Sequence, residues 1–202
     1  MEIKTVLEEM TKGKSAIDLV KFDEKTSKLN IAGITIAPFH DYFLPSILVA
    51  LEKQLGPVAR TLFLRYAKEV GLRDGQTLRN LTFKDGNFTV EEAKKVIVNF
   101  IKMWCSLGWG KLVKAEFTDG YACFIRSTSY EGEGYLKLKP EKGLKLGEDF
   151  IRGEEYSQTP KCTIALGYVM GVIGGVLQKN VNGKETECIG NGGKFCRFEI
   201  RW

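Results

Sequence analysis

Three cysteines near the C-terminus are the residues of this sequence whose type and spacing could do chemistry. Cys188 and Cys196 flank the turn sequence IGNGGK, and Cys162 opens an apolar run further upstream. Thr159 and Pro160 are expected to begin the helix of that run, which would place Cys162 in its first turn. The positive end of the helix dipole would there lower the pKa of the Cys162 thiol and favour the thiolate.

Three thiolates brought to one point would repel one another unless a cation held them. Sulfur ligands in tetrahedral geometry suit zinc, so the cysteines indicate a zinc site that needs one further ligand. Two other interpretations stay open from the residues alone: a disulfide between Cys188 and Cys196, or three buried cysteines that act as small hydrophobic side chains. Five cysteines without a signal peptide argue against a secreted disulfide framework.

A glutamate upstream of Cys188 is the expected fourth ligand. Glu185 and Glu187 both lie in a predicted strand there. Residues three apart in a straight strand point to opposite faces, so Glu185 and Cys188 can share one ion only if the chain bends or bulges near residues 186–187. Spacing alone does not choose between Glu185 and Glu187.

The C-terminal stretch CTIALGYVMGVIGGVLQKNVNGKETECIGNGGKFCRFEI, residues 162–200, resembles the 4-vinyl-reductase domain family. The shared pattern is a cysteine that opens a Gly-rich apolar helix, then Glu-x-x-Cys, seven residues, and a cysteine before a strand. This family includes bacteriochlorophyll-pathway proteins, archaeal hydrocarbon-binding proteins and the sensor domains of aromatic-responsive transcription activators. The helices upstream extend the resemblance, less specifically, over most of residues 40–202.

The resemblance implies a zinc site formed by Cys162, Glu185, Cys188 and Cys196. Four protein ligands close the coordination sphere, so the zinc would be structural rather than catalytic. The resemblance also implies a fold similar to that of TRAPP vesicle-tethering subunits, a homodimer, and a cavity for a hydrophobic or aromatic small molecule.

Aromatic residues along the chain supply candidates for the lining of such a cavity. The candidates are Phe39, Tyr42, Phe43, Phe63, Tyr66, Trp104, Trp109 and Tyr168. Aromatic side chains also fill ordinary protein cores, so each candidate has a purely structural alternative.

Three classes of function remain open. We expect a sensor or carrier domain for a hydrophobic ligand rather than an enzyme. The alternatives are a vinyl-group reductase or accessory protein of tetrapyrrole metabolism, and a dimeric interaction scaffold. His40 is the single histidine, and neither a Gly-x-Gly-x-x-Gly nor a P-loop sequence is present, so a catalytic triad and a nucleotide site lack their usual residues.

Composition restricts the partners. The 202 residues fit one domain, with 44% hydrophobic and 27% charged residues and a net charge of +5 spread without a basic stripe, which argues against nucleic-acid binding. Residues 163–177 carry no charge but are too short to span a bilayer, so we expect a buried helix whose glycines allow another backbone or a ligand to approach closely. We expect a cytoplasmic protein.

Hydrophobic periodicity predicts an α+β fold, in which helices pack on one face of an antiparallel sheet. We expect a strand hairpin at 16–36 within an N-terminal extension (1–37), and a core over 38–202. The helices expected are 41–57, capped by Asp41 or Ser46; 57–71, ended by Gly71; 89–108, with a capping box of Thr89 and Glu92; and 163–177. The strands expected are a pair at 111–129 around Asp119-Gly120, one at 134–139, and a closing hairpin at 182–202.

Overall fold

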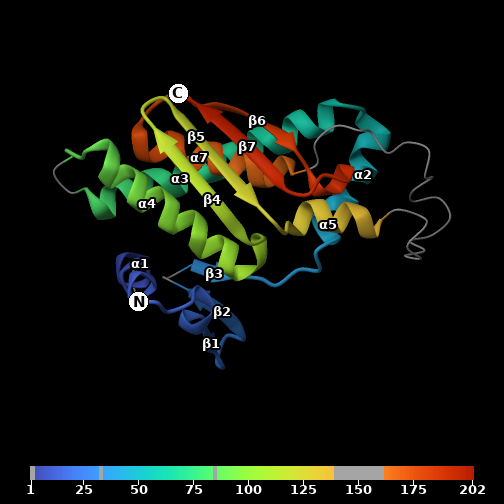
Figure 1. Ribbon diagram of the computed structural model, residues 1–202. Coiled ribbons are helices and arrows are strands. Elements are labelled where there is room, and N and C mark those ends of the chain that lie inside the picture. Colours follow the sequence, from blue (N-terminus) through green and yellow to red (C-terminus); the bar gives the residue numbers. More distant parts are fainter. Residues whose placement is uncertain (1–2, 32–33, 84–85, 139–161) are drawn as a thin grey trace.

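The computed structural model describes residues 3–31, 34–83, 86–138 and 162–202 (Figure 1). Its α-helices are α1 (Ile3–Thr11), α2 (Phe43–Leu55), α3 (Val58–Thr82), α4 (Val90–Trp104), α5 (Tyr130–Lys137) and α7 (Thr163–Leu177). Its short helical segments are the 3-10 turns η1 (Ala16–Leu19) and η5 (Ile189–Asn191) and the π-helical segment η2 (Cys105–Trp109). Its strands are β1 (Lys21–Asp23), β2 (Lys28–Ile31), β3 (Ile34–Ile36), β4 (Leu112–Thr118), β5 (Tyr121–Arg126), β6 (Asn182–Glu187) and β7 (Cys196–Arg201).

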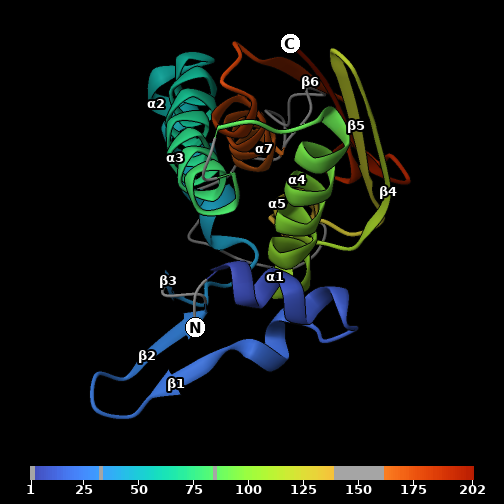
Figure 2. The same cartoon turned by 90° about the vertical axis from the view of Figure 1, so that its left-hand side faces the viewer.

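The strands form two antiparallel sheets. The small sheet has the order β1-β2-β3, and the main sheet has the order β4-β5-β7-β6. The hairpin of β4 and β5 turns at Asp119-Gly120, as predicted, with Gly120 at φ 79°. Helices α4 and α7 pack against one face of the main sheet, and α3 lies on the far side of α7 (Figure 2). The predicted α+β architecture is therefore confirmed.

Helix α7 is the central element of these layers. It lies between the main sheet and α3, and nearly all of its residues are buried (Figure 2). A helix that is apolar on every side belongs in the interior of a protein, which explains the uncharged run. Within the described parts of the chain, no helix has both the length and the apolar character needed to cross a bilayer.

Glycines allow α3 and α7 to pack backbone against backbone. A Cβ atom added at Gly71 would lie 2.2 Å from the Tyr168 carbonyl oxygen, and one at Gly171 would lie 2.1 Å from that of Lys68. The expectation that α7 glycines admit another backbone is confirmed. The expectation that Gly71 ends its helix is wrong, because this glycine is needed for the helix contact and α3 continues to Thr82.

Several local predictions also differ from the structure. The strand expected at 134–139 is wrong, because Tyr130–Lys137 form α5, whose N-cap Ser129 accepts a hydrogen bond from the Gly132 N–H. Helix α2 begins after Tyr42 without a side-chain cap, so neither Asp41 nor Ser46 has that role. The capping box of Thr89 and Glu92 on α4 is confirmed.

The N-terminal region joins the main core. The predicted hairpin is present as β1 and β2, but a third strand, β3, and the helix α1 accompany it. Val6 of α1 and Ile31 of β2 are buried in the same hydrophobic cluster as α4 and α7. Helix α1 was not expected from the sequence.

Candidate metal centre and apolar pocket

The structure brings Cys162, Glu185, Cys188 and Cys196 together. One ligand atom from each lies within 4.8 Å of those of the others, and all four residues are buried. The three sulfur atoms are separated by 3.4 Å (Cys162–Cys196), 3.9 Å (Cys162–Cys188) and 4.0 Å (Cys188–Cys196). Sulfurs about 2.3 Å from a tetrahedral ion would be about 3.8 Å apart. The cluster could therefore hold a metal ion.

Three elements position these four residues. Cys162 is the N-cap of α7, one residue earlier than expected, and Cys196 is the first residue of β7. Glu185 lies on β6, and Cys188 directly follows that strand. Pairing of β6 with β7 shifts in register between Glu185 and Glu187, which is the bulge that the spacing of Glu185 and Cys188 requires.

The two candidate glutamates have different environments. Glu185 is 7% exposed, and its Oε2 accepts the backbone N–H of Cys162 at 2.9 Å. Its Oε1 is buried and has no hydrogen-bond partner among the described residues. Glu187 instead accepts the backbone N–H groups of Lys194 and Phe195 in the turn before β7. A buried carboxylate oxygen beside three sulfurs is the donor that a fourth ligand would supply.

Burial dominates the electrostatics of the cluster. It raises the pKa of Glu185 to about 8. It also raises the pKa of Cys162 well above its ordinary value, so the expected lowering by the helix dipole is wrong for this buried thiol. Hydrogen bonds from Cys162 and Cys188 lower the pKa of Cys196 to about 4, which makes Cys196 the thiol that ionises first. A cation is what would favour ionisation of the whole set.

The start of α7 is satisfied by a residue that the sequence did not disclose. Both oxygens of buried Glu131, on α5, accept N–H groups of the first turn of α7: those of Ile164 at 2.9 Å and Ala165 at 2.8 Å. The cap expected at Thr159 lies outside the described residues. Glu131 thus fixes the end of α7 that carries Cys162.

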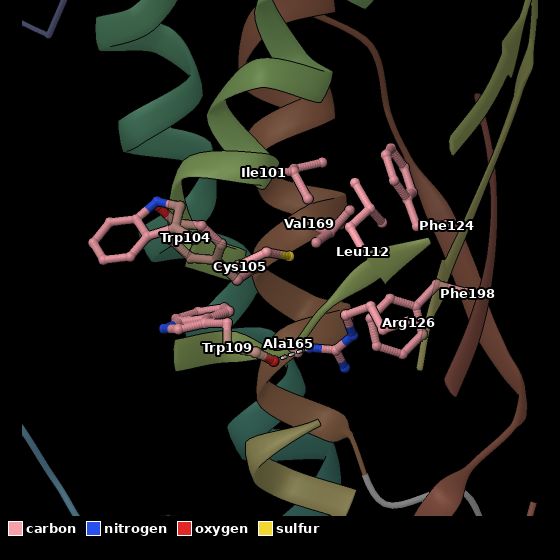
Figure 3. Close-up of a pocket in the computed structure, with 11 residues that line it drawn as sticks. Ile101, Trp104, Cys105, Trp109, Leu112, Phe124, Arg126, Ala165, Val169 and Phe198 are labelled. Carbon is pink, nitrogen blue, oxygen red and sulfur yellow. Dashed lines mark hydrogen bonds between the residues drawn. The ribbon is translucent and has the colours of Figure 1, made fainter. Parts of the chain in front are cut away.

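An apolar pocket lies one helical turn further along α7 (Figure 3). Its volume is about 20 Å³. It is lined by Ile101, Trp104, Cys105, Trp109, Leu112, Phe124, Arg126, Ala165, Tyr168, Val169 and Phe198. These side chains come from α4, η2, β4, β5, α7 and β7, so the pocket lies between the helices and the main sheet.

Three aromatic residues form one wall of the pocket. The Trp109 ring lies 5.6 Å from that of Trp104 and 5.1 Å from that of Tyr168, between ring centroids. The Tyr168 hydroxyl donates a hydrogen bond to Asp74 of α3. Trp109 lies in the π-helical segment between Gly108 and Gly110, both at positive φ. π-Helical turns often occur at functional sites.

The predicted pocket residues separate into two groups. Trp104, Trp109 and Tyr168 line this pocket, whereas the remaining candidates do not. Phe39 and Tyr66 are 63% and 71% exposed. The other three lie near the start of α2 or on α3: Tyr42 stacks on His40, Phe43 stacks on Phe39, and Phe63 packs beside Leu48 in a separate small cluster.

Sequence reasoning missed the aliphatic lining and Arg126. The aliphatic residues gave no signal, because they look like any other core positions. Arg126 did give one, because a charged residue ends an otherwise apolar strand, YACFIR, and is only 3% exposed. Buried arginines are rare unless they are paired.

Comparisons with known proteins agree with this geometry. Residues 147–202 match the family model of the vinyl-4-reductase domain, which confirms the predicted resemblance to the 4-vinyl-reductase family in the C-terminal region. The phenol-responsive sensory domain of the transcription activator PoxR, solved with phenol, is similar at a TM-score of 0.65 and 19% identity, over 98% of this chain and 89% of that one. This similarity shows that the two share a fold.

Two further solved structures are more distant. A trafficking protein particle complex subunit 3 from Naegleria fowleri, covalently bound to palmitic acid, is similar at a TM-score of 0.43 and 12% identity, over 80% of this chain and 93% of that one. A vinyl-4-reductase family protein from Methanocaldococcus jannaschii is similar at a TM-score of 0.37 and 17% identity, over 82% and 98%. No curated protein matches the sequence.

Proposed function

We propose that this protein is a sensor or carrier domain for a hydrophobic or aromatic small molecule, bound in the pocket between α4, α7 and the main sheet. The observation that carries the proposal is the composition of that pocket: ten apolar or aromatic residues and a single charged one, Arg126. Small-molecule sites commonly combine apolar walls with a few fixed polar groups. The phenol-responsive domain of similar fold supports the same ligand class.

Ligand entry requires the aromatic wall to move. A cavity of about 20 Å³ has room for about one water, whereas a cavity that binds benzene measures about 150 Å³. The π-helical segment is the element suited to this movement, because Gly108 and Gly110 flank Trp109 and both have backbone conformations that other residues rarely adopt. Displacement of Trp109 would enlarge the pocket without altering the sheet.

The test is a titration with phenol monitored by tryptophan fluorescence. Two of the three tryptophans, Trp104 and Trp109, line the pocket, and the third, Trp202, packs against Phe117 elsewhere. We expect a saturable fluorescence change and an increase in the melting temperature. Mass spectrometry of the gently purified protein should also detect a bound apolar compound.

A pair of adjacent positions on β4 supplies the matched variants. Leu112 lines the pocket, whereas Val113 is 48% exposed. Leu112→Trp should reduce the affinity for phenol at least about tenfold by filling the space, and Val113→Trp should leave it unchanged. The proposal fails if phenol and other small aromatic molecules give no saturable response in the wild type, or if both variants bind alike.

We further propose that the Cys162, Glu185, Cys188 and Cys196 cluster binds zinc and that this zinc is structural. Three sulfurs and one carboxylate oxygen are a ligand set that suits zinc in tetrahedral geometry. All four ligands come from the protein, which leaves no position for a substrate. The ion would attach the start of α7 to the ends of β6 and β7.

Metal analysis of two glutamate variants tests this proposal. The wild type should contain about one zinc per chain, Glu185→Gln should bind it about 10- to 100-fold more weakly, and Glu187→Gln should bind it like the wild type. Equal retention in both variants would remove Glu185 from the ligand set. A wild type that contains no transition metal would contradict the zinc site itself.

A homodimer is the third part of the proposal. Val58, Leu62, Tyr66 and Val70 recur every four residues along α3 and are 37% to 71% exposed. Such a continuous apolar stripe is typical of a protein interface. Sedimentation at micromolar concentration should show a dimer that Leu62→Lys dissociates and that Val113→Lys, on β4, does not. A monomeric wild type would rule the dimer out.

A further inference from the structure

Arg126 is out of place among the residues that line the pocket. It ends β5, is 3% exposed, and lies beside aromatic and aliphatic side chains (Figure 3). Its guanidinium carbon lies 4.7 Å from the centre of the Phe198 ring. The guanidinium stays charged in proteins, so burying it is costly unless its donors and its charge are compensated.

The structure compensates Arg126 only in part. Its Nη1 donates to the Trp109 carbonyl oxygen at 2.8 Å, and its Nη2 donates to the Ser129 hydroxyl at 3.3 Å. Its Nε is buried and has no hydrogen-bond partner within the described part of the chain. A buried donor without a partner is rare in native proteins and calls for an explanation.

The charge of Arg126 is compensated on the side of the metal cluster. Although burial disfavours the charged form, the negative charges of Cys162, Cys196 and Glu131 raise the pKa of Arg126 above its ordinary value. The Ser129 hydroxyl that accepts from Arg126 also lies 3.1 Å from the Cys162 sulfur. Contacts on two sides thus hold the guanidinium in place and leave Nε as its unused donor.

We propose that Arg126 Nε is the recognition donor of the pocket. The preferred ligand would then be a small, largely apolar molecule that carries one hydrogen-bond-accepting oxygen, such as a hydroxyl or carboxylate group. A purely apolar molecule of the same shape would fill the pocket but leave the donor unpaired, and sites built to bond a polar group discriminate strongly against analogues that lack it. This inference rests on the proposed pocket and adds its specificity.

The test compares phenol with toluene, which is nearly the same size and shape but lacks the oxygen. Both are titrated into the purified wild-type protein at 25 °C and followed by calorimetry and tryptophan fluorescence. We expect phenol to bind at least about tenfold more tightly. Equal affinities, or tighter binding of toluene, would overturn the role of Arg126 and leave the apolar pocket standing. Binding of neither compound would overturn both.

Two arginine variants assign any preference to this residue. Arg126→Met replaces the guanidinium by an apolar chain of similar length and should abolish the preference for phenol while toluene still binds. Arg201→Met, on the neighbouring strand β7 with an exposed side chain, should keep the wild-type preference. A preference that persists in folded Arg126→Met overturns the proposal.

A milder variant covers the case in which Arg126→Met does not fold. Arg126→Lys keeps the positive charge but has no Nε donor. It should lose most of the preference for phenol while its melting temperature stays closer to that of the wild type. An undiminished preference in Arg126→Lys would show that charge alone, and not the Nε donor, selects the ligand, and would overturn the assignment.

Discussion

The metal cluster and the pocket are neighbours on the same two elements, yet they are closed in different ways. Cys162 precedes α7 and Ala165 lies one turn further on, while Cys196 and Phe198 lie two residues apart on the same face of β7. The cluster is a compact set of polar atoms that a single ion could hold. The pocket is closed only by packed side chains. One site is therefore suited to fix the fold and the other to change shape.

The link between the two sites is polar. Arg126 lines the pocket and donates to Ser129, whose hydroxyl contacts the Cys162 sulfur. A change at the cluster would therefore reach the pocket through two side chains and through the first turn of α7. The comparison predicts that damage to the cluster affects both sites, whereas damage to the pocket leaves the cluster intact.

The largest effect should come from removal of a cluster sulfur. Cys196→Ser deletes a buried ligand that contacts both other cysteines. We expect loss of the bound metal and a fall of at least about 3 kcal/mol in the free energy of unfolding, because metal binding contributes directly to folding. Elemental analysis and urea denaturation measure the two quantities.

The matched control is a cysteine outside the cluster. Cys123 on β5 is also buried, at 2% exposed, but belongs to no metal-ligand set among the described residues. Cys123→Ser should keep the metal and lose only about 1 kcal/mol of stability. If the two variants lose stability equally and both keep their metal, the cluster is simply part of the hydrophobic core.

The cluster was readable from the sequence because its signal is local. Cys188 and Cys196 surround one turn, and Glu185 lies three residues upstream of Cys188, so strand geometry alone required the bulge between Glu185 and Glu187 that the structure has. The choice of Glu185 over Glu187 came from family resemblance. The low pKa expected for Cys162 failed because burial, which the sequence does not show, outweighs the helix dipole.

The pocket was much less readable, because its walls come from six elements that are distant in sequence. Trp104 and Tyr168 were recognised as aromatic residues on predicted helices, but Tyr66 has the same appearance and is 71% exposed. Which face of a helix is buried depends on its partners. In the same way Gly71 looked like a helix end, because the contact with α7 that requires a glycine there is a tertiary contact.

A glycine substitution in α7 should have the next largest effect. A Cβ atom at Gly171 would lie 2.1 Å from the Lys68 carbonyl oxygen and 2.6 Å from the Leu72 nitrogen, so α3 and α7 must separate. We expect Gly171→Ala to cost about 3 kcal/mol of stability. The metal content should be unchanged, because the four ligands lie beyond the end of this contact, while phenol binding should weaken because Tyr168 and Val169 move with α7.

Gly174→Ala is the control on the same helix. Its added Cβ would lie 3.2 Å from the Lys179 carbonyl oxygen, a contact that a small shift relieves. The higher helix propensity of alanine offsets part of that strain, so the change should be about 1 kcal/mol or less. Equal losses in the two variants would show that the tight approach of α3 and α7 does not limit the stability of the fold.

The smallest effect should be that of pH, and it should have opposite sign with and without metal. In the metal-free protein, burial raises the pKa of Glu185 and that of Glu131 to about 8. Each carboxyl group binds a proton more tightly in the folded state, so the stability it contributes is present below about pH 4.5 and is lost as the pH rises through about 8. The lowered pKa of Cys196, about 4, acts in the opposite sense over this range. Two carboxyl groups outweigh one thiol, so the net stability of the metal-free protein should fall.

The metal-bound protein should become more stable over the same pH range. Its three thiols are ionised when they bind the metal but take up protons when the chain unfolds and releases it, so the unfolded state binds more protons and stability rises with pH. Urea denaturation between about pH 5.5 and 7.5, with and without a chelator, measures the two slopes. Slopes of the same sign would mean that the cluster does not hold its ion as thiolates. Phenol binding should change little over this range, because Arg126 keeps its charge and the rest of the pocket lining is uncharged.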